Sequence, residues 1–229
     1  MKLLTFRDEK RGPRVGVCIE DRVYDLQDAA KAIGIALPSE MVALLALGSE
    51  GMAQATRVVA HLGRAGLTGQ ALARVELLAP ILRPPKILAL AGNYAEHVRE
   101  SGWDLPDKAH ITPQVFMKPV TAVHPPGKPV VIPRLTETMD YEIELAAVIG
   151  AKGRYIAMED ALSHVAGYMI FNDISARSLT IAKGRTKRPR DDFFDWLNGK
   201  WFDTFAPMGP FLVTADEVGD PQNLKMVLK

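Results

Sequence analysis

The chain contains a single cysteine and almost no net charge, and both scarcities narrow its possible functions. One cysteine cannot form an internal disulfide, so we expect a reducing compartment. Cys18 lies in the apolar alternation RVGVCIE, and we interpret it as part of the core. A formal net charge of +1 provides no general attraction to nucleic acid or to an anionic membrane.

Long hydrophobic runs are also missing. No uninterrupted apolar stretch approaches the ~20 residues that a membrane-spanning helix needs. The opening Met-Lys-Leu-Leu is followed by charged residues from Arg7 to Arg11, which interrupt any signal-peptide core. The expectation is therefore a cytoplasmic protein without nucleic-acid or membrane partners.

The 229 residues, 48% of them hydrophobic and 24% charged, are typical of a folded globular protein. Short strand patterns and then helical patterns fill residues 1–78. Pro80, Pro84 and Pro85 follow, and together they force an extended backbone. We therefore predict a small N-terminal α/β domain at residues 1–78 and a main domain at residues 79–229.

Two glutamates in the segment MDYEIELAAVIG are the strongest candidate ligands. Side chains alternate along a strand, so Glu142 and Glu144 share one face, roughly 7 Å apart. Asp173 follows a second apolar run of strand character at residues 165–171. Three carboxylates without Cys or His suit Mg²⁺, Mn²⁺ or Ca²⁺ rather than zinc. The alternative is an amphipathic strand whose glutamates face water.

Other candidate groups flank this segment. His97 and Glu100 are three residues apart on a predicted helix at residues 94–100, so Glu100 could orient His97 as a general base. Mixed surface charges are the alternative explanation. Lys118 ends an apolar strand, Lys200 lies beside aromatic residues, and Arg177 falls on a helix predicted at residues 174–180. The basic run KGRTKRPR precedes two aspartates. This order favours a charge-balanced loop that covers an anionic substrate.

Six segments in this order resemble the fumarylacetoacetate hydrolase family: PPKILALAGNYAEHVRE, FMKP, DYEIELAAVIG, GYMIFNDISAR, GKWFDTFAPMGP and DPQNLKMVL. The resemblance covers residues 79–229 and implies a β-rich α+β fold, a mixed β-roll of that family's type, assembled as a homodimer. Family members continue with further strands and a T-G-T-P-x-G loop, so we expect the C-terminal part of the catalytic domain to lie beyond Lys229.

The resemblance also implies roles for the candidate residues. It implies a Mg²⁺ ion, or Mn²⁺ or Ca²⁺, and it assigns catalysis and substrate binding to two further groups of side chains. The metal ligands would be Glu142, Glu144 and Asp173; the catalytic residues would be His97, Glu100 and Lys200; the substrate contacts would be Tyr94, Lys118, Arg177 and Thr180. Thr180 departs from the family pattern, which has Gln there.

The expected substrate is a small anionic 2-oxo acid. We expect hydrolysis of a C–C bond in an acylpyruvate or fumarylacetoacetate-like β-diketo acid through a metal-stabilised enolate. His97 would deprotonate the water, and Lys200 would stabilise the developing charge. The same enolate would serve oxaloacetate decarboxylation or a hydroxymuconate-type isomerisation. A non-catalytic metal-binding protein is the alternative from another class.

Overall fold

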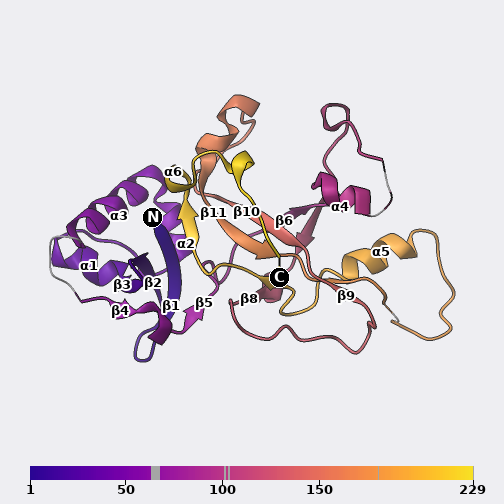
Figure 1. Cartoon of the computed structure of the whole chain (residues 1–229), viewed down its shortest axis with the longest axis horizontal. Helices are drawn as coiled ribbons and strands as arrows, with labels where there is room; N and C mark the ends of the chain where they lie inside the picture. The colour runs from indigo at the N-terminus through magenta and orange to yellow at the C-terminus, as the bar shows by residue number, and fades with distance from the viewer. Residues whose placement is uncertain (63–67, 101, 103, 180, 229) are drawn as a thin grey trace.

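The computed structural model describes residues 1–62, 68–100, 102, 104–179 and 181–228 (Figure 1). Its largest element is an eight-stranded sheet in which every paired neighbour is antiparallel. The strand order is β10-β11-β14-β1-β2-β3-β4, and β5 also pairs with β1. The bounds of these strands are β1 Lys2–Asp8, β2 Gly12–Ile19, β3 Arg22–Asp25, β4 Gln70–Ala71, β5 Leu77–Leu78, β10 Ile143–Ile149, β11 Val165–Asn172 and β14 Leu212–Thr214.

Three two-stranded sheets and six α-helices complete the regular structure of the described residues. The small sheets pair β6 with β7, β9 with β12 and β8 with β13. Their strands are β6 Ile87–Leu90, β7 Val115–Lys118, β8 Val123–His124, β9 Met139–Asp140, β12 Ser175–Ala176 and β13 Ala206–Pro207. The helices are α1 Leu26–Ala32, α2 Met41–Ala46, α3 Gly48–Leu62, α4 Ala95–Glu100, α5 Asp191–Asn198 and α6 Ala215–Val218. Short 3-10 turns occur at Leu72–Arg74, Lys108–His110, Val120–Ala122, Met158–His164 and Pro221–Asn223.

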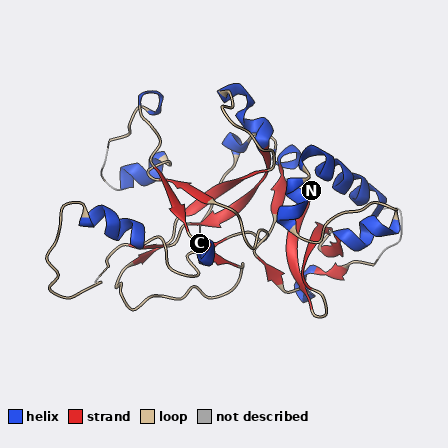
Figure 2. Cartoon of the chain, turned by 180° about the vertical axis from the view of Figure 1, so that it is seen from behind, coloured by secondary structure: helices blue, strands red, loops and turns tan. Residues whose placement is uncertain are grey.

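Helices α1, α2 and α3 gather beside β1, β2 and β3 at one end of the molecule, whereas α4 and α5 lie towards the other end (Figures 1 and 2). Apolar residues recur on one side of α3, and the buried Ala55, Val58 and Leu62 share one core with the sheet residues Leu3 and Val17. The mixture of helices with a large antiparallel sheet confirms the predicted α+β fold class. Among the described residues, none of the helices combines the length and apolar character needed to cross a membrane.

The main sheet continues across the predicted domain boundary. Strand β14, near the end of the chain, pairs with both β1 and β11. The early strands and the strands around the carboxylates therefore belong to one hydrogen-bonded surface. The division at residue 78 stays a prediction.

One sequence expectation about secondary structure was wrong. Residues 174–180 were expected to begin a helix, but Ser175–Ala176 forms β12 and pairs with β9. The Arg177 amide also donates to the Thr138 carbonyl, because a neighbouring strand satisfies this backbone better than an isolated turn would.

Gly167 allows β11 to approach β14 closely. A Cβ atom added at Gly167 would lie 2.2 Å from the Val213 carbonyl oxygen. We expect Gly167→Ala to lower the free energy of unfolding by about 2 kcal/mol or more, since backbone must move to relieve the overlap. Urea denaturation followed by circular dichroism measures the change. Ala147→Val, which enlarges an exposed side chain of β10, is the control; equal stability of Gly167→Ala and the parent protein would contradict the prediction.

Candidate metal and substrate site

Three carboxylates meet where β10 begins and β11 ends. Ile143 pairs with Asn172 in the antiparallel register, so Glu142 and Asp173 are the next residues along their strands. The Asp173 amide donates to the Glu142 carbonyl oxygen at 2.9 Å, which continues the ladder by one step. One carboxylate oxygen from each of Glu142, Glu144 and Asp173 lies within 4.8 Å of the others. The structure thus brings together the three carboxylates that the sequence singled out.

Glu144 differs from the other two carboxylates in having no cationic partner. Glu142 and Asp173 are paired with basic side chains, whereas Glu144 makes no ion pair with any residue that the structure describes. Burial, together with the charges of Asp173 and Glu142, raises the pKa of Glu144 to about 7. An unpaired, partly buried carboxylate beside two others fits a hard divalent cation with oxygen ligands.

Lys200 follows α5 and reaches into the carboxylate cluster. Its Nζ donates to Asp173 Oδ2 at 2.7 Å and to the two oxygens of Glu142 at 3.1 and 3.3 Å. The ammonium is 5.3 Å from the centre of the Phe116 ring and 5.8 Å from that of Trp196. These rings meet edge to face, with centroids 5.0 Å apart. The aromatic walls reduce the access of water to Lys200 and strengthen its charge interactions.

Lys118 is buried beneath the cluster, with only 1% of the residue exposed. Its Nζ donates to Asp173 Oδ1 and to the Ile174 carbonyl oxygen. Burial lowers the pKa of Lys118, while the adjacent Asp173 acts in the opposite direction. The sequence suggested a substrate contact for Lys118. In the structure its ammonium supports a carboxylate of the cluster, and the substrate-binding role stays a prediction.

Arg177 lies on the solvent side of the cluster. Its guanidinium donates to Glu142 Oε1 at 2.6 Å and to Asp140 Oδ2 at 3.0 Å. Ser175, two residues earlier, donates its hydroxyl to the same Glu142 oxygen at 2.8 Å. Glu142 is therefore fixed from three directions, by Lys200, Arg177 and Ser175. Ser175 was not predicted from the sequence, because a serine before an arginine gives no signal without the strand pairing.

Helix α4 is anchored beside the cluster by Tyr94. The Tyr94 hydroxyl accepts a hydrogen bond from the Leu145 amide of β10 at 3.0 Å, and burial raises the pKa of this phenol. Glu100 ends α4 with an exposed side chain, and the side chain of His97 lies outside the described part of the structure. The proposed pairing of His97 with Glu100 stays a prediction. Thr180 also lies outside the described residues.

Trp196 is a further site residue, and it was not predicted from the sequence. It belongs to α5, a helix that was likewise not predicted. The signal was present: Phe193, Trp196 and Leu197 have helical spacing, and Asp191 and Asp192 provide the acidic first turn that favours a helix start.

A family model for the C-terminal domain of fumarylacetoacetate (FAA) hydrolase matches residues 86–229. The mitochondrial oxaloacetate tautomerase FAHD2A of Bos taurus is 37% identical over 190 residues, which cover 83% of this chain and 55% of that protein. The mitochondrial oxaloacetate tautomerase fahd2 of Xenopus laevis is 35% identical over 229 residues, covering 98% of this chain and 65% of that protein. The chain thus spans about half to two thirds of the length of these relatives.

Solved structures show the same similarity. Maleylpyruvate hydrolase from Sphingobium sp. SYK-6, in complex with manganese(II) and pyruvate, superimposes with a TM-score of 0.67 at 30% identity, covering 96% of this chain and 70% of that one. A probable 2-hydroxyhepta-2,4-diene-1,7-dioate isomerase from Mycobacterium abscessus gives a TM-score of 0.65 at 30% identity, covering 98% of this chain and 67% of that one. The family match and these shared folds confirm the resemblance seen in the sequence: the chain belongs to the fumarylacetoacetate hydrolase family.

Proposed function

We propose that this chain is a divalent-metal-dependent enzyme that converts a small 2-oxo acid through an enolate of the substrate. The cluster of Glu142, Glu144 and Asp173 carries the proposal, because it offers three oxygen ligands and leaves Glu144 without a cation. A divalent cation held there would neutralise negative charge that develops on a keto oxygen. The manganese and pyruvate named for the maleylpyruvate hydrolase support this reading.

The first candidate reaction is hydrolysis of an acylpyruvate. His97, oriented by Glu100, takes a proton from water, and the water oxygen attacks the carbonyl farther from the carboxylate. The C–C bond then breaks, its electron pair passes to the pyruvate fragment as an enolate, and a proton at carbon completes pyruvate. Lys200 lies in the cluster where this negative charge develops.

The second candidate is tautomerisation of oxaloacetate, favoured by the names of relatives that are 37% identical. This reaction removes a proton from carbon and returns it to oxygen, so it needs a base and stabilisation of an enolate but no attacking water. Both reactions use the same cluster. The cytoplasmic location and the homodimer remain predictions, and the animal relatives named above are mitochondrial.

Divalent metal should stabilise the protein, and more strongly at high pH. The pKa of Glu144 is raised from 4.5 to about 7, so the metal-free fold loses stability as the pH rises from 4.5 through 7. Metal binding must displace the proton below pH 7. We expect Mn²⁺ or Mg²⁺ to raise the Tm of EDTA-treated protein more at pH 8 than at pH 6.

Matched variants test this assignment by differential scanning fluorimetry. Glu144→Gln should abolish the metal-induced rise in Tm, whereas Glu159→Gln, an exposed carboxylate on the 3-10 turn Met158–His164, should leave it unchanged. A metal effect that survives Glu144→Gln would argue against the cluster as the metal site.

His97 should be needed for catalysis but not for metal binding. With Mg²⁺ or Mn²⁺, we expect the full chain to hydrolyse acetylpyruvate, which lowers the diketo-enol absorbance of this substrate. EDTA should stop the hydrolysis. His97→Ala should lower kcat by about 100-fold or more, because a general base contributes 10²–10⁴-fold. It should keep the metal-induced rise in Tm, and His61→Ala on α3 should retain parental activity.

The same assay run with oxaloacetate separates the two candidate reactions. Turnover of oxaloacetate enol without cleavage of acetylpyruvate would favour the tautomerase. Hydrolysis that persists in His97→Ala would remove the role assigned to this residue.

A further inference from the structure

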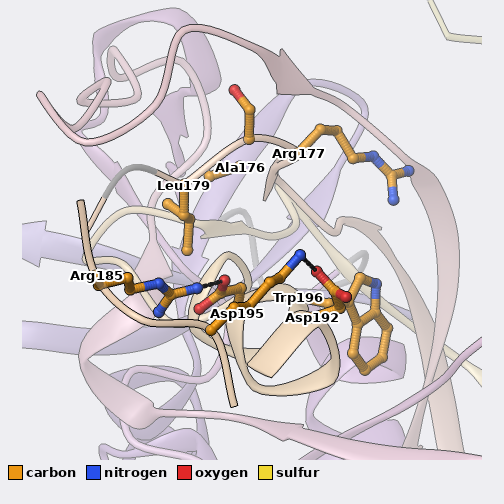
Figure 3. A pocket seen from close by; sticks show the side chains of 9 residues that line it. Ala176, Arg177, Leu179, Arg185, Asp192, Asp195 and Trp196 are labelled. Carbon is orange, nitrogen blue, oxygen red and sulfur yellow. Dashed lines mark hydrogen bonds and ion pairs between the residues drawn. The ribbon is translucent and has the colours of Figure 1, made fainter. Parts of the chain in front are cut away.

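A pocket of about 370 Å³ lies beside the carboxylate cluster, between the segment that follows β12 and helix α5 (Figure 3). Arg177 and Trp196 line this pocket and also face the cluster. Arg177 donates to Glu142 Oε1 at 2.6 Å, and the Trp196 ring centre is 5.8 Å from Lys200 Nζ. A ligand with one end at the carboxylates could therefore extend past Arg177 and Trp196 into the pocket.

The far side of the pocket is built from two ion pairs. Arg185 pairs with Asp195 of α5, as a dashed line in Figure 3 marks, and Lys187 pairs with Asp192. The Lys187 and Asp192 side chains are 60% and 83% exposed, so solvent screens their attraction. Arg185 and Asp195 are only 30% and 19% exposed. The ion pair of Arg185 is thus less exposed to solvent than that of Lys187, and solvent screens it less.

Arg185 still has free donors. A guanidinium carries five N–H groups, and one nitrogen of Arg185 donates to Asp195 while its other donors have no acceptor among the residues that the structure describes. Asp195 holds the guanidinium in place, and the remaining N–H groups have the fork geometry that binds a carboxylate. Trp196 offers a flat apolar wall for a carbon chain between the two ends.

We propose that this pocket binds the far carboxylate of an elongated substrate, and that Arg185 makes the site selective for 2-oxo diacids over 2-oxo acids with an uncharged tail. The inference rests on the proposed function, since it places the 2-oxo acid end at the carboxylate cluster. Arg185 is a specificity-determining residue, and Asp195 is the residue that positions it.

A matched pair of ligands tests the proposal in the Mn²⁺-loaded full chain. 2-Oxoadipate and 2-oxohexanoate share a six-carbon chain and differ in the terminal carboxylate. Isothermal titration calorimetry should show 2-oxoadipate binding roughly ten-fold more tightly or better, the range of one charge-assisted hydrogen-bonded contact. Equal affinities, or no binding of 2-oxoadipate, would overturn the proposal.

Variants of Arg185 locate the effect. Arg185→Gln should weaken 2-oxoadipate about ten-fold and change 2-oxohexanoate by less than about two-fold. Arg185→Lys keeps the positive charge but loses the paired N–H donors of the guanidinium, so it should retain part of the preference for 2-oxoadipate. This variant replaces Arg185→Gln in the test if Arg185→Gln does not fold. Arg188→Gln is the control, because Arg188 pairs with Asp191, the first residue of α5, without lining the pocket. Equal weakening of both ligands by Arg185→Gln or by Arg185→Lys, or the same loss in Arg188→Gln, would refute the assignment.

Acetylpyruvate separates this inference from the proposed function, because it has no far carboxylate. If the parent protein and Arg185→Gln turn it over alike while the diacid preference is missing, only the pocket assignment fails. If neither acetylpyruvate nor oxaloacetate is converted, the proposed function fails, and the calorimetry still decides whether Arg185 selects diacids.

Discussion

Repulsion among three carboxylates is the constraint on which the site depends. Oxygens of Glu142, Glu144 and Asp173 lie within 4.8 Å of one another at the partly buried end of a strand pair. Like charges this close repel strongly where water is scarce, so cations must balance them or a proton must be taken up. Lys118 and Lys200 pair with the cluster, and burial together with the charges of Asp173 and Glu142 raises the pKa of Glu144 to about 7.

The balancing cations come from segments that are far apart in the chain. Lys118 ends β7, Arg177 follows β12 and Lys200 follows α5. The pairing of β6 with β7 holds Lys118, and the pairing of β9 with β12 holds the segment before Arg177, so two of the small sheets position charge. Removing one of these basic side chains would leave a buried carboxylate without a compensating charge. Substitutions of the basic residues should therefore lower the stability of the fold.

The aromatic pair of Phe116 and Trp196 links the carboxylate cluster to the neighbouring pocket. One surface of this pair faces Lys200, and Trp196 also lines the cavity that contains Arg185. The basic run at residues 183–190 was expected to be charge-balanced, and the structure shows how: Arg185, Lys187 and Arg188 pair with three aspartates of α5. These ion pairs are local, so they hold residues 185–188 against α5. They leave N–H donors of Arg185 facing the pocket.

Local sequence determined much of the fold and the identity of the ligands. Short apolar segments of strand character predicted the strands β1, β2, β10 and β11, and the order of the family's motifs indicated the α+β fold. Glu142, Glu144 and Asp173 could be recognised because strand periodicity and the end of an apolar run place carboxylates at defined positions. Helix α5 was also within reach, since its spacing and acidic first turn are local features.

Contacts between distant segments were decided only by the tertiary structure. A sequence does not state which strand will pair with Ser175–Ala176, so the helix expected there was wrong and the place of Arg177 beside Glu142 was hidden. The buried contact of Lys118 with Asp173 joins residues 55 positions apart, and the contact of Ser175 with Glu142 joins residues 33 positions apart, so neither could be predicted from local sequence. Periodicity reports which face of an element is apolar, but the partner of each polar group is chosen by packing of the whole chain.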